Sequence, residues 1–533
     1  MEKRALLAAV ISAVVLFLWF AIFPPPKGGE PERAPAEVSE VQREVPSAVP
    51  VGSGAVAAPA EIREAVGGAA EERIELEGEG WRAVLSTRGA VLRSLILSGY
   101  RDEAGQPLEL IGQEGPTPLA MAAAGSWNDA LYSVERDASG VVLRWSDGAG
   151  SWVEKRVGAG KGRYGLEIEV VAGGRAGRDG VVVAVGRDGK GGGAAGFATI
   201  GAVARVAGEM ERLASGKLEN PKELRGEVTY AGVEDHYFLM VLLPEQRLDT
   251  VRAWSYKGGT GPVAVLAALP GDGTVRGTLY GGPKEHRILT AYGRSLDETL
   301  SFGLFGIFSV GFLAVMRWIH SWAANWGVAI ILLTAAIRLL LFPLTHKATV
   351  AMRRMQALQP KMKAIQDRYQ ERAKRDPQAR QRMNQEVMGL YKQEGVNPMG
   401  GCLPTLVQLP ILWALYTLFA NAIELRQAPF FLWVKDLSLP DTLFTIPFGG
   451  GWDFPFRPLA LLMGGSMWLQ QKLAPQVGDP TQRRIFMMMP ILFTVMFYGF
   501  PSGLVLYWLV NNVLTIAQQL ITERLLRDKP VAT

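Results

Sequence analysis

One apolar stretch, residues 325–345 (NWGVAIILLTAAIRLLLFPLT), constrains this chain more than any other part of the sequence. It is long enough to cross a bilayer as a helix, which needs about 20 residues. Arg338 lies well inside the stretch, which contains no acidic residue. An arginine at bilayer depth costs about 2.5–3.5 kcal/mol on insertion scales. The sequence therefore predicts a membrane helix whose arginine meets water, a cavity or a functional partner.

The distribution of apolar residues divides the chain into a water-soluble part and a membrane part. Its 533 residues are too many for one hydrophobic core, and the long apolar blocks are concentrated after about residue 300. The net charge is only +5, and the basic residues gather in short segments beside apolar blocks, which indicates membrane topology rather than nucleic-acid binding. Because Cys402 is the single cysteine, no intrachain disulfide can form.

The N-terminus has a short basic head, MEKR, followed by an apolar run to residue 23. The run is long for a cleavable signal peptide and no small-x-small site follows it, so an uncleaved transmembrane anchor over residues 1–23 is favoured over a removed signal peptide. The basic head predicts a cytoplasmic N-terminus. Residues 24–70 are rich in Pro, Ala, Glu and Gly, which predicts a flexible linker.

Short runs of alternating apolar and polar residues recur from residue 71 to residue 295, separated by Gly, Asp and Asn. This period of two predicts an all-β sandwich or barrel. Glu234, Asp235 and His236 are adjacent and could be imagined as a metal or acid–base site, but a polar turn beside a strand is favoured. The glycines at 191–193 predict a flexible loop rather than a phosphate loop. We expect no catalytic residue, no cofactor and no metal.

Charge decides the topology of the membrane part. If the apolar block at residues 300–322 crossed the membrane, the strongly basic segment 346–401 would lie outside, against the preference of Lys and Arg for the cytoplasm. We therefore expect 300–322 to be an interfacial amphipathic helix, with Arg317 and His320 toward the head groups. The tail, 522–533, is then cytoplasmic. Six spans result, at residues 1–23, 326–344, 402–422, 458–473, 485–500 and 503–521.

The basic segment 346–401 predicts a helical hairpin, with its second helix beginning after Asp376-Pro377 because proline is favoured in a first helical turn. Methionines recur along the first helix at helical spacing, and they either pack the two helices together or line a mobile surface that contacts incoming chains or anionic lipid. The candidate contact residues are Met352, Met355, Met362, Lys361 and Lys363.

Polar residues recur at four-residue spacing within the predicted spans. Thr334 and Arg338 share one helical face, as do Asn511 and Thr515, while Gln408 lies between two prolines. These residues could simply join helices, and Arg338 could snorkel to the cytoplasmic end of its span, about 9 Å away. Polar faces on several spans favour a shared hydrophilic pocket that opens toward the cytoplasm.

Several long motifs in the membrane part resemble the YidC/Oxa1/Alb3 family of membrane protein insertases. They are NWGVAIILLTAAIRLLLFPLT, LQPKMKAIQDRY, EGVNPMGGCLPTLVQLPI, ELRQAPFFLWVKDLS and FPSGLVLYWLVNNVLTIAQQ, and the resemblance runs from about residue 300 to residue 522. The β region, with its GGPKE motif, resembles the large periplasmic domain of Gram-negative members more loosely. The resemblance implies a multi-domain protein with a five-helix membrane core, an N-terminal anchor helix and a periplasmic β-supersandwich.

The resemblance also implies a function, the insertion and folding of inner-membrane proteins, alone or with the Sec translocon (SecYEG and SecDF). It implies a substrate groove open to cytoplasm and lipid, with Arg338, Thr334 and Tyr507–Trp508 in or near it, and a hairpin that meets nascent membrane proteins. Further partners are lipids and, because the tail is short, a weakly bound ribosome, but no nucleic acid. An anion transporter or channel that uses Arg338 and a membrane-anchored carbohydrate enzyme are the alternatives. We expect Arg338→Ala to impair substrates with acidic outer segments and Arg338→Lys to work largely as before.

Overall fold

The computed structural model describes most of the chain after residue 63. The described ranges are residues 64–102, 104–112, 116–122, 124–137, 140–177, 180–185, 201–258, 261–268, 273–300, 302–303, 305–373, 376–395, 403–447, 453–474 and 480–527. The predicted anchor, most of the predicted linker, the glycine loop at 191–193 and the last six residues lie outside these ranges.

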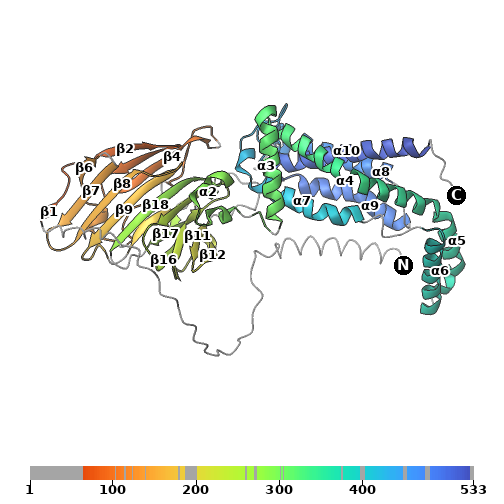
Figure 1. The fold of residues 1–533 in the computed structure, drawn as a ribbon, viewed down its shortest axis with the longest axis horizontal. Coiled ribbons are helices and arrows are strands. Elements are labelled where there is room, and N and C mark those ends of the chain that lie inside the picture. The colour runs from red at the N-terminus through yellow and green to blue at the C-terminus, as the bar shows by residue number, and fades with distance from the viewer. Residues whose placement is uncertain are drawn as a thin grey trace, which may run out of the picture. The chain divides into compact units, whose positions relative to one another are not determined.

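The first part of the described chain is built of antiparallel β-sheets, as the alternating pattern predicts (Figure 1). The largest sheet has the order β1 (Ala65–Val66), β7 (Gly140–Asp147), β8 (Trp152–Ala159), β9 (Gly165–Gly173), β18 (Thr274–Pro283), β15 (Phe238–Pro244), β14 (Val228–Glu234), β11 (Gly201–Val206) and β12 (Glu209–Ala214), with β6 (Ser133–Asp137) paired to β7. A second sheet has the order β10 (Val181–Val185), β17 (Gly261–Ala268), β16 (Thr250–Gly258) and β13 (Lys222–Arg225). A third has the order β2 (Arg73–Gly78), β3 (Trp81–Ser86), β4 (Val91–Arg101) and β5 (Pro107–Glu109).

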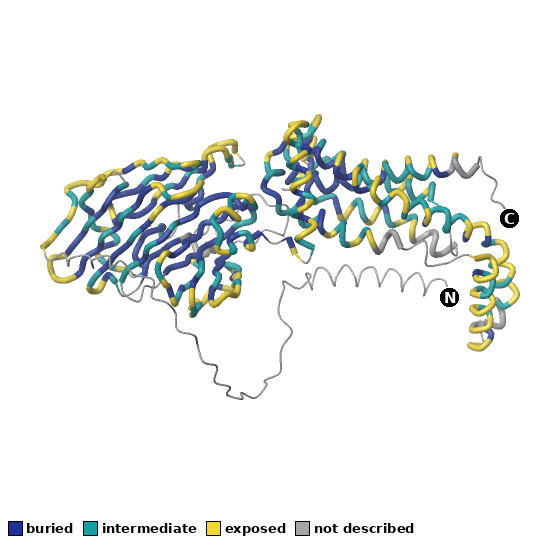
Figure 2. Tube along the Cα trace, in the orientation of Figure 1, coloured by how far each residue is buried: buried dark blue, intermediate teal, exposed yellow. Residues whose placement is uncertain are grey.

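The two smaller sheets pack on the large one, and the side chains between them form the core of this domain. The second sheet contacts β11, β14 and β15, while β2 of the third contacts β8. Trp81 of β3 is fully buried, and its indole Nε1 donates to the carbonyl of Gly165 at 3.1 Å. Residues that face this core alternate with more exposed ones along β2 and along the middle of β8 and β9, which is the physical origin of the period of two in the sequence (Figure 2).

Helices make up most of the chain after Pro283. They are α2 (His286–Tyr292), α3 (Gly306–Ala323), α4 (Trp326–Ala357), α5 (Gln359–Ala373), α6 (Pro377–Gln393), α7 (Leu403–Asn421), α8 (Pro458–Leu473), α9 (Pro480–Phe497) and α10 (Ser502–Arg527). A small hairpin, β19 (Phe444–Pro447) with β20 (Asp453–Phe456), lies between α7 and α8. Within the described residues, two helices are long and apolar enough to cross a membrane, namely α4 and the segment Ser502–Thr522 of α10. Shorter apolar helices cover Val407–Asn421 and Phe486–Phe497, so a helix stands at each of the five core spans predicted after residue 320.

The helix α3 stands at the predicted interfacial segment, and its Arg317 has a partner within the fold. The helix α3 lies across the ends of α4 and α7 and contacts both (Figure 1). The Arg317 guanidinium is largely buried and forms an ion pair with Glu424, with Nε 2.9 Å from Oε1. Glu424 follows α7 in the 3₁₀ turn Ile423–Leu425, about one hundred residues away, and this partner could not be found from the local pattern.

Several element boundaries differ from those predicted. The linker ends earlier than residue 70, because Ala65–Val66 already pairs with β7. Two helices run past the predicted ends of their spans, α4 to Ala357 and α10 to Arg527. Hydropathy marks where a helix leaves an apolar environment, whereas helical hydrogen bonding continues until the backbone meets an obstacle. For α4 that obstacle is Pro360, which favours a new first turn and so separates α4 from α5.

Candidate functional site

Arg338 lies on α4 about 18 Å along the helix from Trp326. Asn325 caps the helix, since its side chain accepts from the backbone N–H of Val328 at 3.1 Å. The Arg338 side chain is half-buried, and its Nε donates to Oδ1 of Asn511 on α10 at 2.7 Å. In the described part of the chain it forms no ion pair with a carboxylate. A neutral amide therefore fixes the inner edge of the guanidinium, and its charge is not cancelled.

The contact between Arg338 and Asn511 is the first of three polar side-chain contacts that the described residues make between α4 and α10. Further along, Gln518 Nε2 donates to Thr345 Oγ1 at 2.6 Å, and His346 Nδ1 lies 3.4 Å from Thr522 Oγ1. The sequence separations of the three pairs are 173, 173 and 176, so the two helices run side by side in the same direction. We call this set the polar seam; its members are Arg338, Thr345 and His346 on α4 and Asn511, Gln518 and Thr522 on α10.

A second polar contact lies between α7 and α10. Gln408 Nε2 donates to the hydroxyl of Tyr507 at 3.2 Å, and the Tyr507 ring is buried beside Phe419, with ring centres 6.0 Å apart. The structure thus pairs two of the predicted groove residues that lie about one hundred positions apart. It pairs Arg338 with Asn511 in the same way.

The other predicted groove residues make contacts of a different kind. The Thr334 hydroxyl is buried and donates to the carbonyl of Ile330 in its own helix, and Thr515 does the same to Asn511. Trp508 packs against Phe493 and Phe497 of α9, with ring centres 5.9 and 5.0 Å away, and its buried indole N–H has no partner among the described atoms. Adjacent residues on a helix point about 100° apart, so Tyr507 and Trp508 necessarily face different neighbours.

Four of the six residues of the polar seam were not among the groove residues predicted from sequence: Thr345, His346, Gln518 and Thr522. Asn511, Thr515 and Gln519 share a face by four-residue spacing, but Asn511, Gln518 and Thr522 share the face that meets α4. Both patterns fit a helix equally well until the neighbouring helix is known. A second asparagine beside the first, Asn512, is buried and donates to Ser466 on α8 at 2.9 Å.

The hairpin contacts predicted from sequence divide into packing and exposed residues. Met355 is buried, and the Tyr391 hydroxyl donates a hydrogen bond to the sulfur of Met362 at 2.9 Å. These methionines therefore help to pack α4, α5 and α6 together. Met352 is half-buried, whereas Lys361 and Lys363 are exposed, and Lys361 pairs with Glu394 at 2.6 Å. The second helix begins at Pro377 as predicted, with Asp376 accepting from the N–H of Gln378 at 2.9 Å.

The Glu234-Asp235-His236 segment forms a polar turn whose side chains are all engaged by the fold. Glu234 is buried and paired with Arg212 and Lys284, each at 2.8 Å. Asp235 Oδ1 accepts from two backbone N–H groups, at 2.8 and 2.6 Å, within the turn itself. Among the described residues, no group of three or more His, Cys, Asp or Glu side chains is arranged to hold a metal ion.

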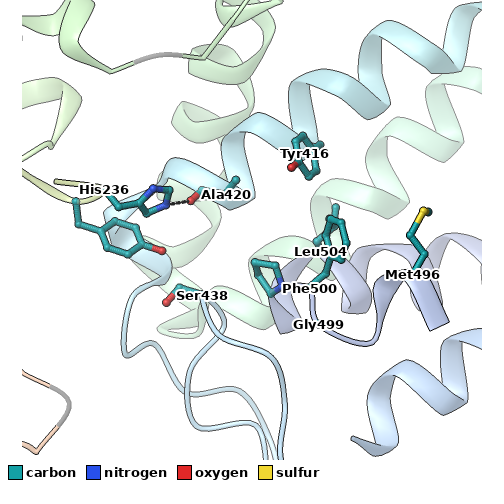
Figure 3. A pocket seen from close by; sticks show the side chains of 10 residues that line it. His236, Tyr416, Ala420, Ser438, Met496, Gly499, Phe500 and Leu504 are labelled. Atoms are coloured by element: carbon teal, nitrogen blue, oxygen red, sulfur yellow. Dashed lines mark hydrogen bonds between the residues drawn. The ribbon is translucent and has the colours of Figure 1, made fainter. Parts of the chain in front are cut away.

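His236 has a role that the sequence pattern did not reveal. Its Nε2 lies 2.6 Å from the carbonyl oxygen of Ala420 near the end of α7, and since a carbonyl only accepts, Nε2 carries the proton (Figure 3). Burial lowers the pKa of His236, so the ring is neutral at pH 7. Beside it, a cavity of about 190 Å³ reaches Tyr416, Phe500 and Leu504. Its walls are mostly apolar, and it is separate from the polar seam.

Comparison with known proteins gives both halves of the chain the same affiliation. The family model described as the YidC periplasmic domain matches residues 73–315, and the one described as 60Kd inner membrane protein matches residues 318–529. The membrane protein insertase YidC of Geobacter metallireducens is 35% identical over 97% of this chain and 98% of its own length. The chain belongs to the YidC family of membrane protein insertases.

Other YidC-family relatives agree. The YidC insertase of Syntrophus aciditrophicus is 32% identical over 97% of this chain and 99% of its own length. That of Syntrophobacter fumaroxidans is 49% identical over 46% of this chain and 43% of its own length. A crystal structure of an active YidC insertase, at 20% identity, covers 85% of this chain and 93% of its own with a TM-score of 0.37, a similarity too weak to carry a structural argument.

YidC-family membership confirms the resemblance noted in the motifs and assigns the chain to the inner membrane, with its β-rich domain in the periplasm. Because insertases perform no covalent chemistry, it also confirms the prediction that the chain is not an enzyme. The transporter, channel and carbohydrate-enzyme alternatives are not favoured.

Proposed function

We propose that this chain inserts and folds membrane proteins in the bacterial inner membrane and that substrates use a hydrophilic groove along the polar seam. The observation that carries the proposal is Arg338, held at Nε by the neutral side chain of Asn511. Its two terminal nitrogens remain to attract acidic groups of a substrate segment. Gln408 and Tyr507 supply further polar groups beside this path, while Thr334 and Thr515 supply small side chains along it.

The physical work is to carry a short hydrophilic substrate segment across hydrocarbon. A groove that admits water along the seam shortens the apolar barrier, and a fixed positive charge lowers it further for acidic segments. The energy comes from partitioning of the substrate's apolar helix into lipid and from the membrane potential, which is worth about 2.3 kcal/mol per charge per 100 mV. The groove opens toward the cytoplasm and the lipid, and substrate helices leave along α7 and α9.

The topology belongs to the same proposal. Six spans, with the anchor at residues 1–23 and helices α4, α7, α8, α9 and α10, place both termini and the basic hairpin in the cytoplasm. This orientation rests on the concentration of Lys and Arg between α4 and α7. The hairpin, through exposed residues such as Lys363, first meets nascent chains and lipid there. The Sec translocon, with SecYEG and SecDF, and a weakly bound ribosome complete the proposed partners.

Site-specific crosslinking during synthesis of a small membrane protein tests the groove. A photoreactive residue replaces Leu341 or Thr515, which lie beside the polar seam, and in a separate variant replaces Trp322, which is exposed on α3. We expect nascent-chain adducts from the first two positions before any from the third. No seam adducts, together with normal adducts from a Sec translocon control, would overturn the groove. Uptake of a small anion that depends on Arg338 would favour a transporter instead.

A further inference from the structure

A cavity of about 650 Å³ lies between the periplasmic domain and α3, well away from Arg338. Its walls come from β4 and the turn before β9, from the start of α2, and from α3 with the start of α4. None of the proposed groove residues lines it, and its walls combine arginines with tryptophans. This mixture suits a ligand with one charged end and one apolar end.

The tryptophans place the cavity at the level of the lipid head groups. Trp326, which lines it, is the first residue of the apolar helix α4 and stacks on His320, with ring centres 4.2 Å apart. Trp318 also lines it, and Trp318 and Trp322 on α3 are 67% and 59% exposed. Exposed tryptophans gather where a membrane helix meets water. With Val315, these two form one exposed apolar face of α3.

The charges around the cavity leave an excess of positive charge. Arg317 is engaged by Glu424 and lies 3.9 Å from Glu285, so one arginine serves two carboxylates. Arg163 and Arg287 also line the cavity, and neither forms an ion pair with another described residue. Three arginines against two glutamates leave one net positive charge. An occupant with one net negative charge therefore fits best.

We infer that this cavity binds the head group of an anionic phospholipid, with the phosphate at Arg163 and Arg287 and the glycerol end against Trp318 and Trp326. The acyl chains then run along the exposed apolar face of α3. A free phosphate is a poorer occupant, because Arg163 and Arg287 are solvent-exposed and an exposed ion pair gains little in water. The tryptophan walls add affinity only for a ligand that carries an apolar part.

Lipid retention on the full-length protein tests this site. Protein purified in detergent is titrated with phosphatidylglycerol or with phosphatidylcholine of the same acyl chains, and bound lipids are counted by native mass spectrometry. The test variant is Arg163→Gln/Arg287→Gln. The matched control is Arg82→Gln/Arg247→Gln, which removes two exposed arginines of the same domain that are paired with Glu77 and Asp249. An arginine close to anionic lipid contributes appreciably to its binding, so we expect the test variant to bind phosphatidylglycerol about tenfold more weakly. Arg82 and Arg247 do not line the cavity, so the control should match the unmodified protein.

Three results would overturn the inference: equal phosphatidylglycerol binding by the test and control variants, equal binding of both lipids by the unmodified protein, or displacement of the lipid by millimolar inorganic phosphate. The last result would identify a site for a free anion. Thermal unfolding of each variant verifies that it is folded. If the double variant is unstable, Arg287→Gln alone, at an exposed position on α2, should still weaken phosphatidylglycerol binding severalfold without changing phosphatidylcholine binding.

Discussion

Buried charges in the periplasmic domain and in the membrane helices are treated in opposite ways. In the periplasmic domain, the carboxylate of Glu234 has Arg212 and Lys284 as partners, each at 2.8 Å. The Lys155 ammonium group, fully buried, donates to the carbonyls of Gly89 and Leu119 at 2.7 Å and to that of Ala90 at 3.2 Å. Each of these two groups has all of its polar contacts within the domain, with at least two partners.

Arg338 differs because its partner, Asn511, engages only Nε of the guanidinium. A charge surrounded by partners holds a fold together, because removing one partner leaves another charge buried and unpaired. A charge held at one edge remains available to a ligand. The difference between the two regions therefore separates residues that matter for stability from residues that matter for insertion, and substitutions can test that separation.

The largest effect is expected from Glu234→Ala. It leaves Lys284 and Arg212 without their shared carboxylate, and breaking such a buried pair costs about 3–5 kcal/mol. Hydrogen exchange of β14 and β18 in the full-length protein measures the loss. The matched control is Glu223→Ala, which breaks exposed pairs with Arg252 and Arg225 and should change exchange little. Similar protection in both variants would mean that the buried constellation is not a stability element.

Arg338→Ala should leave folding intact but slow insertion of a substrate with an acidic outer segment. Loss of a charged hydrogen-bonding group is worth about 1.5–3 kcal/mol, or about ten- to a hundredfold in rate. Protease protection in proteoliposomes measures insertion, with a neutral-segment substrate as the control. Arg338→Lys keeps the charge but cannot reproduce the Nε contact to Asn511. Its rate of insertion of the acidic substrate should therefore lie between those of the unmodified protein and Arg338→Ala. Equal loss for acidic and neutral substrates would show that the charge does not recognise the substrate.

Lys155 predicts a pH dependence confined to the periplasmic domain. Burial lowers the pKa of Lys155 to about 7, whereas in the unfolded chain it is about 10.4. Between these values the unfolded chain holds a proton that the folded chain lacks. The free energy of unfolding should therefore rise with pH, by at most about 1.4 kcal/mol per pH unit.

The measurement for Lys155 is the melting temperature of the full-length protein at pH 7 and pH 9, for the unmodified chain and for Lys155→Met. Comparing the two chains cancels titration of other groups. Identical pH dependence would mean that the three carbonyl acceptors keep Lys155 protonated throughout this range.

The smallest effect distinguishes two neighbouring asparagines. Asn511→Ala releases the guanidinium of Arg338, and since one hydrogen bond contributes about 0.5–1.5 kcal/mol, insertion should slow by about two- to tenfold. Asn512→Ala removes a bond to Ser466 on α8 and should lower stability while leaving the acidic-substrate preference unchanged. If both variants lose that preference equally, Asn511 has no special part in positioning Arg338.

The sequence by itself determined the order and type of the elements. Period-two runs become the strands, apolar blocks become the helices, and Asp376-Pro377 begins α6. These features follow from local physics, because side-chain alternation, hydrophobic length and helix capping each act within a few residues. For the same reason Arg338 could be singled out: its cost depends only on the apolar stretch around it.

Only the tertiary structure decided which of the polar residues meet. Asn511 contacts Arg338 while Asn512 contacts Ser466, although both occupy equivalent places in the sequence pattern. Arg317 pairs with Glu424, a partner that no local pattern indicated. A helix offers several polar faces at once, and the choice between them is made by the helix that packs against it. That helix comes from a segment 46 residues away for Asn512 and 173 residues away for Asn511, so no local pattern contains it.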